Sequence, residues 1–292
     1  MKIDLVIADP AKNITAFVLN PVPVKERAAL STAIMADPAL KTEQVAFVVP
    51  PARGENRSWR LEMMGGEFCG NAARSFGLYV AGKIGLRGRR TVTVESSGAN
   101  SAIPVQVDTG TGRAEAEIPA PRFLTALDFE GRALPLCVFD GITHVLAPGL
   151  KPDRETFFAI KAAAEKTGAP GVTPSGAIGV APSGALGVMF LDPPAGQTGA
   201  GGLSFVGGAE LAMTPAVYVY GTDSLVFESS CGSGSAALAV YQSRDSAAGE
   251  TRYEINQPGG VIEVRVVKRG GAVESVAIGG PVTLRELTWE RE

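Results

Sequence analysis

Two cysteines in this chain begin short runs of small residues that suit the start of a helix. The first run is Cys69-Gly70-Asn71-Ala72 and the second is Cys231-Gly232-Ser233-Gly234, one in each half of the 292-residue sequence. A helix N-terminus presents unpaired backbone N–H groups and the positive end of the helix dipole, which favour a thiolate or a bound carboxylate. Two such thiols on opposite sides of one carbon would remove a proton from one face and return a proton to the other.

Removal of the α-proton of an amino acid leaves a carbanion whose charge moves into the carboxylate group. Backbone donors stabilise that charge as it develops, and loss of one such donor typically costs about 10²–10³ in rate. We therefore expect the substrate carboxylate to bind at Gly70 and Asn71 in the first half, and at Gly232 and Ser233 in the second. One thiol must begin each turnover as the thiolate and the other as the thiol, so their titrations are coupled.

Other interpretations of the candidate residues remain open at this point. A cysteine beside glycine also fits burial as a small apolar side chain, although two matched runs favour catalysis. Cys137 lies in an apolar stretch and is expected to be buried, and His144, the only histidine, would by itself be a structural hydrogen-bonding residue. Glu67 and Glu228 precede their cysteines, and each is either a partner of the helix dipole or a solvated charge.

Composition and charge narrow the class of protein. Hydrophobic residues make up 45% and charged residues 20%, as in a globular domain. The net charge of −3 gives no electrostatic case for binding nucleic acid or an anionic membrane, so the expected partner is a small molecule. Three cysteines, with no secretory signal and no apolar run of membrane-spanning length, favour a reduced cytoplasmic enzyme.

Metal and cofactor sites are not expected. The two motif cysteines are 162 residues apart, and the chain contains no paired Cys-x-x-Cys, so metal-ligand spacing is missing. No residue pattern identifies a Schiff-base lysine or a phosphate cup for pyridoxal phosphate.

The order of expected helices and strands indicates that the two halves of the chain are diverged copies. A helix from Cys69 to about Lys83 is followed by expected strands near 91–94, 103–107 and 114–118. A helix from Cys231 to about Arg244 is followed by expected strands near 252–255, 261–266 and 273–278. This order predicts an internal duplication with the two cysteines at equivalent positions. Between the copies, the pattern predicts a strand at 136–139 and an amphipathic helix at 153–166 with Asp153 as its N-cap.

The motifs resemble those of the cofactor-independent amino-acid racemases and epimerases, whose type member is diaminopimelate epimerase. The resemblance rests on Cys69-Gly70-Asn71-Ala72-Ala73-Arg74 and on the run from Ser230 to Ala239. It extends to Asn13, to Thr143-His144-Val145 in place of the family's Asn-Pro-His turn, and to a C-terminal Gly-Pro strand at 277–282. It implies an α/β (α+β) fold of two pseudo-symmetric domains, each a curved mixed β-sheet or barrel around a central helix.

The resemblance also implies the layout of the site. The first lobe would span 1–118, with 280–292 as a candidate return segment, and the second would span 119–279, with the active site in the cleft between them. Cys69 and Cys231 would be the acid and base pair, and no cofactor or metal would be needed. By the resemblance, Asn13, Gly70, Asn71, Gly232 and Ser233 would bind the substrate, and His144 would tune or position the site. Their positions before the two cysteines add Glu228 as a substrate-binding candidate and Glu67 as a further one. A homodimer is a family expectation.

Departures from diaminopimelate epimerase bear on the substrate. That enzyme has Glu-Arg-Gly before its second cysteine, whereas the region 221–228 of this chain lacks the arginine, and Ile142 replaces the asparagine of the Asn-Pro-His turn. A second zwitterionic head group would be buried there without partners, which argues against diaminopimelate.

The run from Gly65 to Ala72 is most similar to histidine racemases, including those that supply D-histidine to opine metallophore synthesis. Glu67, Asp223 or Glu228 would then pair with an imidazole ring. The alternatives are diaminopimelate epimerase or another amino-acid racemase, an isomerase or dehydratase on the same fold, and a non-catalytic ligand-binding or thiol-redox protein.

Overall fold

The computed structural model describes residues 2–49, 59–121, 123–139, 141–167, 184–192 and 211–290. The chain divides into two compact units, of which unit 1 comprises Met1–Ile118 and Ala277–Glu292 and unit 2 comprises Pro119–Val276. The return to unit 1 begins at 277, three residues before the segment expected from the sequence, and it occurs within strand β16 (Ala272–Pro281).

Unit 1 is a mixed sheet that curves around one helix. Its helices are α1 (Val24–Met35) and α2 (Gly70–Lys83), and its strands are β1 (Lys2–Asp9), β2 (Thr15–Val18), β3 (Gln44–Val49), β4 (Trp59–Met63), β5 (Arg89–Ser96), β6 (Ile103–Asp108), β7 (Arg113–Ile118) and β17 (Thr283–Glu290). Successive partners run β17, β1, β2, β3, β4, β5, β6, β7, and the β2–β3 and β4–β5 pairs are parallel whereas the others are antiparallel. Strand β7 also pairs with β16.

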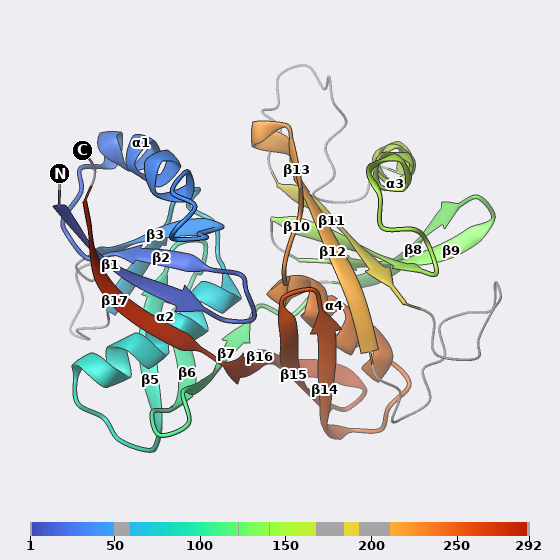
Figure 1. Cartoon of the computed structure of the whole chain (residues 1–292). Helices are drawn as coiled ribbons and strands as arrows, with labels where there is room; N and C mark the ends of the chain where they lie inside the picture. Colours follow the sequence, from blue (N-terminus) through green and yellow to red (C-terminus); the bar gives the residue numbers. More distant parts are fainter. Residues whose placement is uncertain are drawn as a thin grey trace. The chain divides into compact units, whose positions relative to one another are not determined.

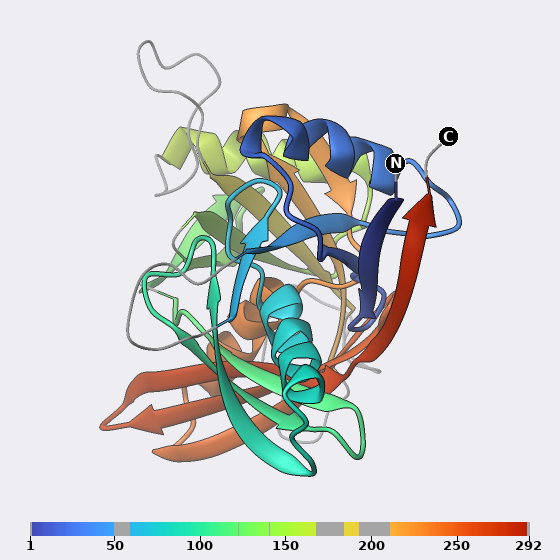
Figure 2. The ribbon, with the colours of Figure 1, turned by 90° about the vertical axis from the view of Figure 1, so that its left-hand side faces the viewer.

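Helix α2 lies at the centre of unit 1 and is buried along most of its length. Every residue from Asn71 to Ala81 is buried, which is typical of a helix enclosed by its domain rather than one lying on a surface. Figure 2 shows α2, in cyan, between β1 and β17 on one side and β5 to β7 on the other. A Cβ built at Gly77 would lie 2.6 Å from the side chain of Val105, so only glycine allows β6 to pack this closely.

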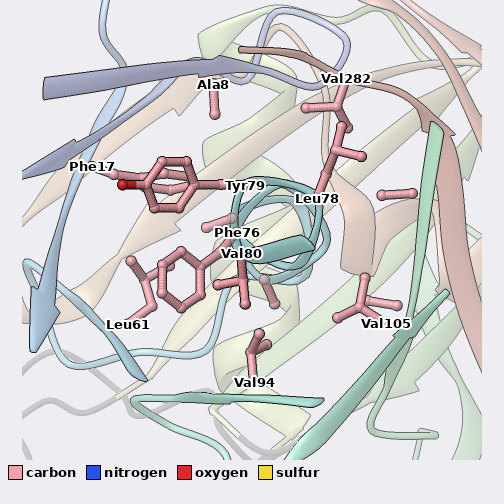
Figure 3. Packing of buried hydrophobic residues seen from close by; sticks show 14 of the residues in the cluster. Ala8, Phe17, Leu61, Phe76, Leu78, Tyr79, Val80, Val94, Val105 and Val282 are labelled. Atoms are coloured by element: carbon pink, nitrogen blue, oxygen red, sulfur yellow. The ribbon is translucent and has the colours of Figure 1, made fainter. Parts of the chain in front are cut away.

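The core of unit 1 consists of side chains from α2 and from the strands around it. Figure 3 shows Phe76 of α2 surrounded by residues that include Phe17, Leu61 and Val94. The Phe17 and Phe76 rings meet edge to face with their centroids 5.7 Å apart. Burial of a large apolar side chain contributes about 1.5–3 kcal/mol, so this cluster is the main reason that α2 keeps its position.

Unit 2 repeats this architecture. Its helical segments are α3 (Arg154–Thr167), η1 (Tyr220–Thr222) and α4 (Gly232–Ser243), and its strands, besides part of β16, are β8 (Phe123–Phe129), β9 (Arg132–Val138), β10 (Ile142–Pro148), β11 (Ala185–Leu191), β12 (Leu211–Val219), β13 (Ser224–Phe227), β14 (Gly249–Gln257) and β15 (Gly260–Arg269). Helix α4 packs against β9, β10, β14 and β15, and α3 packs against β8 and β11 (Figure 1).

The pairing of strands shows the duplication directly. Strands β1 to β6 pair in the order antiparallel, parallel, antiparallel, parallel, antiparallel. Strands β9, β10, β11, β12, β14 and β15 pair in the same order. In both units one helix connects the second and third strands of this series and another connects the fourth and fifth. The α+β fold with two pseudo-symmetric halves is therefore confirmed.

Most of the elements expected from the sequence are present, with small differences at their ends. Helix α2 ends at Lys83 as expected, and α4 ends at Ser243, one residue before the expected end. The backbone N–H of Thr156 donates to Oδ1 of Asp153 (2.9 Å), which confirms that N-cap. Strand β9 begins at Arg132 rather than at 136. None of the helices in the described part of the chain is long and apolar enough to cross a membrane.

The segment Thr143-His144-Val145, which the resemblance matched to the family's Asn-Pro-His turn, is part of strand β10. Its register with β11 sets His144 opposite Gly187, and its other edge pairs with β9. Pairing along both edges holds these residues in extended conformation.

Candidate active site

Both motif cysteines occupy the N-cap position of their helices. Cys69 precedes α2 with φ −123° and ψ 111°, and Cys231 precedes α4 with φ −126° and ψ 113°. Their carbonyl groups accept the first helical hydrogen bonds, from the N–H of Ala73 (2.9 Å) and the N–H of Ser235 (3.0 Å) respectively. The two helix starts therefore share one backbone geometry, in which each cysteine immediately precedes the unpaired N–H groups of a first turn.

In unit 1, the amide of Asn13 lies beside the sulfur of Cys69. Asn13 is buried in the connection between β1 and β2. Its Oδ1 accepts hydrogen bonds from Nε2 of Gln44 (2.8 Å) and Nδ2 of Asn71 (3.3 Å), and it lies 4.0 Å from Sγ of Cys69. Its Nδ2 donates to Oε2 of Glu43 (3.0 Å). These contacts fix the orientation of the amide, so that a carbonyl oxygen faces the thiol.

Arg74 holds Asn71 in place from within α2. Its side chain is fully buried, and its Nε donates to Oδ1 of Asn71 (3.1 Å). Its Nη1 donates to the carbonyls of Gly280 (3.1 Å) and Pro281 (3.4 Å), which belong to β16. The guanidinium thus connects the first turn of α2 to the return segment, and it adds a positive charge near the positive end of the helix dipole.

Two glycines permit close packing around Cys69. A Cβ at Gly70 would lie 2.8 Å from Cδ1 of Ile278 and 2.9 Å from Cγ2 of Ile118, so a larger residue would displace the helix start. Gly98, in the turn after β5, has φ +68°, and a Cβ there would overlap the backbone nitrogen of Phe68. The hydroxyl of Ser97 donates to the carbonyl of Glu67 (2.9 Å). The turn after β5 therefore supports the residues that lead into Cys69.

In unit 2, a glutamine performs the corresponding support. The backbone N–H of Cys231 donates to Oε1 of Gln257 (2.7 Å), at the end of β14. Nε2 of Gln257 donates to Oγ of Ser235 (2.9 Å), whose hydroxyl donates to the carbonyl of Cys231 (2.7 Å). The N–H of Gly259 donates to the carbonyl of Ser229 (2.8 Å). The hairpin of β14 and β15 thus fixes the backbone on both sides of Cys231.

The sulfur of Cys231 is buried, with 7% of the residue exposed. It lies 3.7 Å from Oγ of Ser233, which in turn lies 2.9 Å from Nε2 of His144. Burial raises the pKa of Cys231 well above its usual value, and the negative charge of Glu228 raises it further. Hydrogen bonds from the N–H of Gly234 and from the hydroxyl of Ser233 lower the pKa of Cys231.

His144 is fully buried, and this burial lowers its pKa to about 3, so the imidazole is neutral near pH 7. The ring packs edge-on against Phe139, with centroids 5.7 Å apart. Opposite it in β11, a Cβ at Gly187 would overlap Nδ1 of the ring, so glycine makes room for the imidazole.

Cys137 has a structural environment, as the sequence indicated. It is 1% exposed, and its thiol donates to the carbonyl of Ala237 in α4 (3.6 Å). Burial raises its pKa to about 12, so it remains a thiol at neutral pH.

The acidic candidates differ in their surroundings. Glu67 is exposed, whereas Glu228 is half-buried and interacts electrostatically with Cys231. Asp223 is exposed and accepts a hydrogen bond from the hydroxyl of Tyr218.

Several residues of these networks were not identified as site residues from the sequence: Glu43, Gln44, Arg74, Ser97, Ser235 and Gln257. The duplication was a signal for Ser97 and Gln257, because the strand after each helix ends beside that helix's start. Polar residues near 97 and 257 could have been marked on that ground.

No group of three or more His, Cys, Asp or Glu side chains suited to a metal ion occurs among the residues that the structure describes.

The sequence profile described as "Histidine racemase CntK N-terminal domain" matches residues 2–173 and 196–286 of the chain. The chain belongs to the histidine racemase family. The family that the motifs resembled is thereby confirmed, and membership makes this protein an isomerase of the racemase and epimerase type.

Individual members of the histidine racemase family align along nearly the whole chain. The histidine racemase of Fusobacterium nucleatum is 30% identical over 287 residues, which cover 95% of this chain and 96% of the relative. The histidine racemase of Staphylococcus aureus is 21% identical over 280 residues, covering 94% and 92% respectively.

The crystal structure of a probable proline racemase from Agrobacterium radiobacter, solved with bound carbonate, shares the fold with a TM-score of 0.61 at 16% identity. The alignment covers 98% of this chain and 92% of that chain.

Proposed function

We propose that this protein interconverts L- and D-histidine by proton transfer at Cα, with Cys69 and Cys231 as the two bases and no added cofactor. The observation that carries the proposal is the matched N-cap geometry of the two cysteines, whose φ and ψ agree within a few degrees, in a chain of the histidine racemase family. Each helix start offers a thiol and N–H donors together, which is the equipment that carbanion chemistry requires.

In one direction, the thiolate of one cysteine removes the α-proton and becomes a thiol. The electron pair left on Cα moves into the carboxylate, where the helix-start N–H groups at Gly70, Asn71, Gly232 and Ser233 would stabilise the charge. The thiol of the other cysteine then donates its proton to the opposite face of Cα and becomes a thiolate. The two cysteines have exchanged protonation states, and the reverse reaction restores them.

Glu228 is our candidate for binding the imidazole of the substrate. It is half-buried and its charge is felt at Cys231, whereas Glu67 and Asp223 are both exposed. We expect Glu228→Gln to raise KM for histidine more than it lowers kcat, because the contact is made in the ground state and the transition state alike. A variant with kcat reduced and KM unchanged would contradict this role.

The deciding experiment incubates reduced protein with L-histidine in D₂O without cofactor, and follows α-deuterium by NMR and chirality by chromatography. We expect deuterium incorporation together with inversion. Cys69→Ser and Cys231→Ser should each abolish inversion, since a hydroxyl is a far weaker acid and base than a thiol near pH 7. Near wild-type rates in either variant would refute the two-thiol mechanism.

The chain supplies a matched control in its third cysteine. Cys137→Ser makes the same atomic change at a buried thiol with a pKa of about 12, so inversion should be retained.

A parallel incubation with diaminopimelate tests the substrate, because clear preference for diaminopimelate would refute the inference from the missing arginine. The expected homodimer and cytoplasmic location remain predictions.

A further inference from the structure

We propose that His144 and Ser233 form a positioning relay, which directs a hydroxyl proton at the sulfur of Cys231 and stabilises its thiolate. The proposal deepens the function proposed above and rests on it, because it concerns Cys231 as a base. The three side chains belong to one unit: His144 comes from β10, Ser233 from the first turn of α4, and Cys231 from the N-cap. The Nε2–Oγ distance is 2.9 Å and the Oγ–Sγ distance is 3.7 Å.

The buried surroundings of His144 decide which ring nitrogen carries the proton. Within the described part of the chain, Nδ1 is buried with no hydrogen-bond partner, and the backbone of Gly187 packs closely against it. A buried N–H without an acceptor is rarer in proteins than an acceptor without a donor. The proton therefore resides on Nε2, and Nε2–H donates to Oγ of Ser233.

This tautomer determines the direction of the Ser233 hydroxyl. With a lone pair of Oγ accepting from the imidazole, the hydroxyl proton is available for Sγ of Cys231. A thiolate accepts such a bond strongly, because hydrogen bonds to a charged partner are about twice as strong as neutral ones. Ser233, expected from the sequence to bind substrate, thereby acts on the base as well.

Cys231 needs this support because burial and a nearby negative charge oppose its ionisation. Burial and the charge of Glu228, on the segment between β13 and α4, both disfavour the thiolate. The imidazole of His144 on β10 is neutral and contributes no charge. On β15, Lys268 donates to the carbonyls of Ser243 and Arg244 at the far end of α4. The Ser233 hydroxyl and the N–H of Gly234 are thus the donors that favour the thiolate.

The relay is tested by titrating Cys231 directly, without the racemase reaction. In a Cys69→Ala background, the rate of iodoacetamide alkylation at Cys231 is measured against pH, and the modified peptide is identified by mass spectrometry. We expect Ser233→Ala to move the midpoint up by about one pH unit, which slows alkylation about tenfold below the midpoint. An unchanged midpoint would overturn the proposal.

Two further comparisons separate the relay from a general structural effect. Ser230→Ala removes the hydroxyl of the neighbouring buried serine, for which the described residues offer no hydrogen-bond partner, and should leave the midpoint unchanged. His144→Leu should raise the midpoint, whereas His144→Gln, which keeps an N–H donor, should restore it toward that of the parent. A shift in Ser230→Ala equal to that in Ser233→Ala, or equal shifts in the two His144 variants, would refute the relay.

This readout is independent of the proposed function. If the wild-type protein fails to racemise histidine while the midpoints move as expected, the relay stands and the substrate assignment fails.

Discussion

The two helix starts have the same backbone but place different partners beside their sulfur atoms. Cys69 is half-buried and faces a carbonyl oxygen of Asn13, whose orientation is fixed by its own hydrogen bonds. Cys231 is buried and faces the hydroxyl of Ser233, which can donate as well as accept. An oxygen that only accepts suits a thiol, and a hydroxyl also suits a thiolate. Duplication therefore preserved the backbone while the side chains around the two thiols diverged.

The supports behind the two helix starts differ in the same way. In unit 1 the residues before Cys69 contact the turn that contains Ser97 and Gly98. In unit 2 the backbone of Cys231 contacts the side chain of Gln257. The first support depends on close backbone packing and the second on a single amide, so the two should differ in their tolerance of substitution.

The largest effect is expected for Gly98→Ala in the tight turn of unit 1. Gly98 has φ +68°, and a Cβ there would meet the backbone of Phe68, so both strain and overlap destabilise the fold. We expect a loss of about 3–5 kcal/mol in the free energy of unfolding, measured by urea denaturation. Gly88→Ala is the matched control, since φ is +67° and a Cβ there would have no atom of the described residues within 4 Å, and it should cost only about 1 kcal/mol. Equal losses would show that close packing is unimportant at Gly98.

A smaller effect concerns the pH dependence of stability in unit 2. The folded pKa of His144 is about 3, well below its unfolded value, so the imidazole stabilises the fold fully above pH ~6.5. As pH falls, the unfolded chain takes up the proton and the folded chain does not, which costs about 1.4 kcal/mol per pH unit. Between pH ~6.5 and ~5, wild type should lose about 2 kcal/mol more than His144→Gln in urea denaturation.

His144 is the only histidine in the sequence, so no other histidine contributes to this difference in stability loss between wild type and His144→Gln. Identical losses in the two proteins would show that the ring gains a proton in the folded state and would contradict its burial as a neutral group.

The smallest effect is expected for Gln257→Ala. The substitution leaves the N–H of Cys231 and the hydroxyl of Ser235 without their amide partner, which should cost about 1–2 kcal/mol in the free energy of unfolding. Gln106 is exposed on β6, and Gln106→Ala should change stability by less than about 0.5 kcal/mol. Denaturation of the two variants side by side measures the difference. A loss at Gln257 no greater than at Gln106 would show that the amide does not support the helix start.

Local pattern was sufficient to predict α2, α3 and α4, the strands after the two motif helices and the burial of Cys137, whereas α1 was not predicted. The alternation of apolar residues in 103–107 and 261–266 specifies strands wherever they pack, because one face must be buried. It could not predict the strand pairing of His144, because His144 lies opposite Gly187 of β11, about 40 residues further along the chain. The partnership of His144 with Ser233 spans 89 residues and depends on how β10 packs against α4.

The sequence by itself determined which chemical groups are available: two thiols, each followed by small residues that begin a helix with unpaired N–H groups. Residues adjacent in sequence produce that arrangement, so both helix starts can be predicted without knowledge of the tertiary structure. Only the tertiary structure decided what faces each sulfur. The contacts of Cys69 with Asn13 and of Ser233 with His144 join residues 56 and 89 positions apart, and strand register and helix packing fix such contacts.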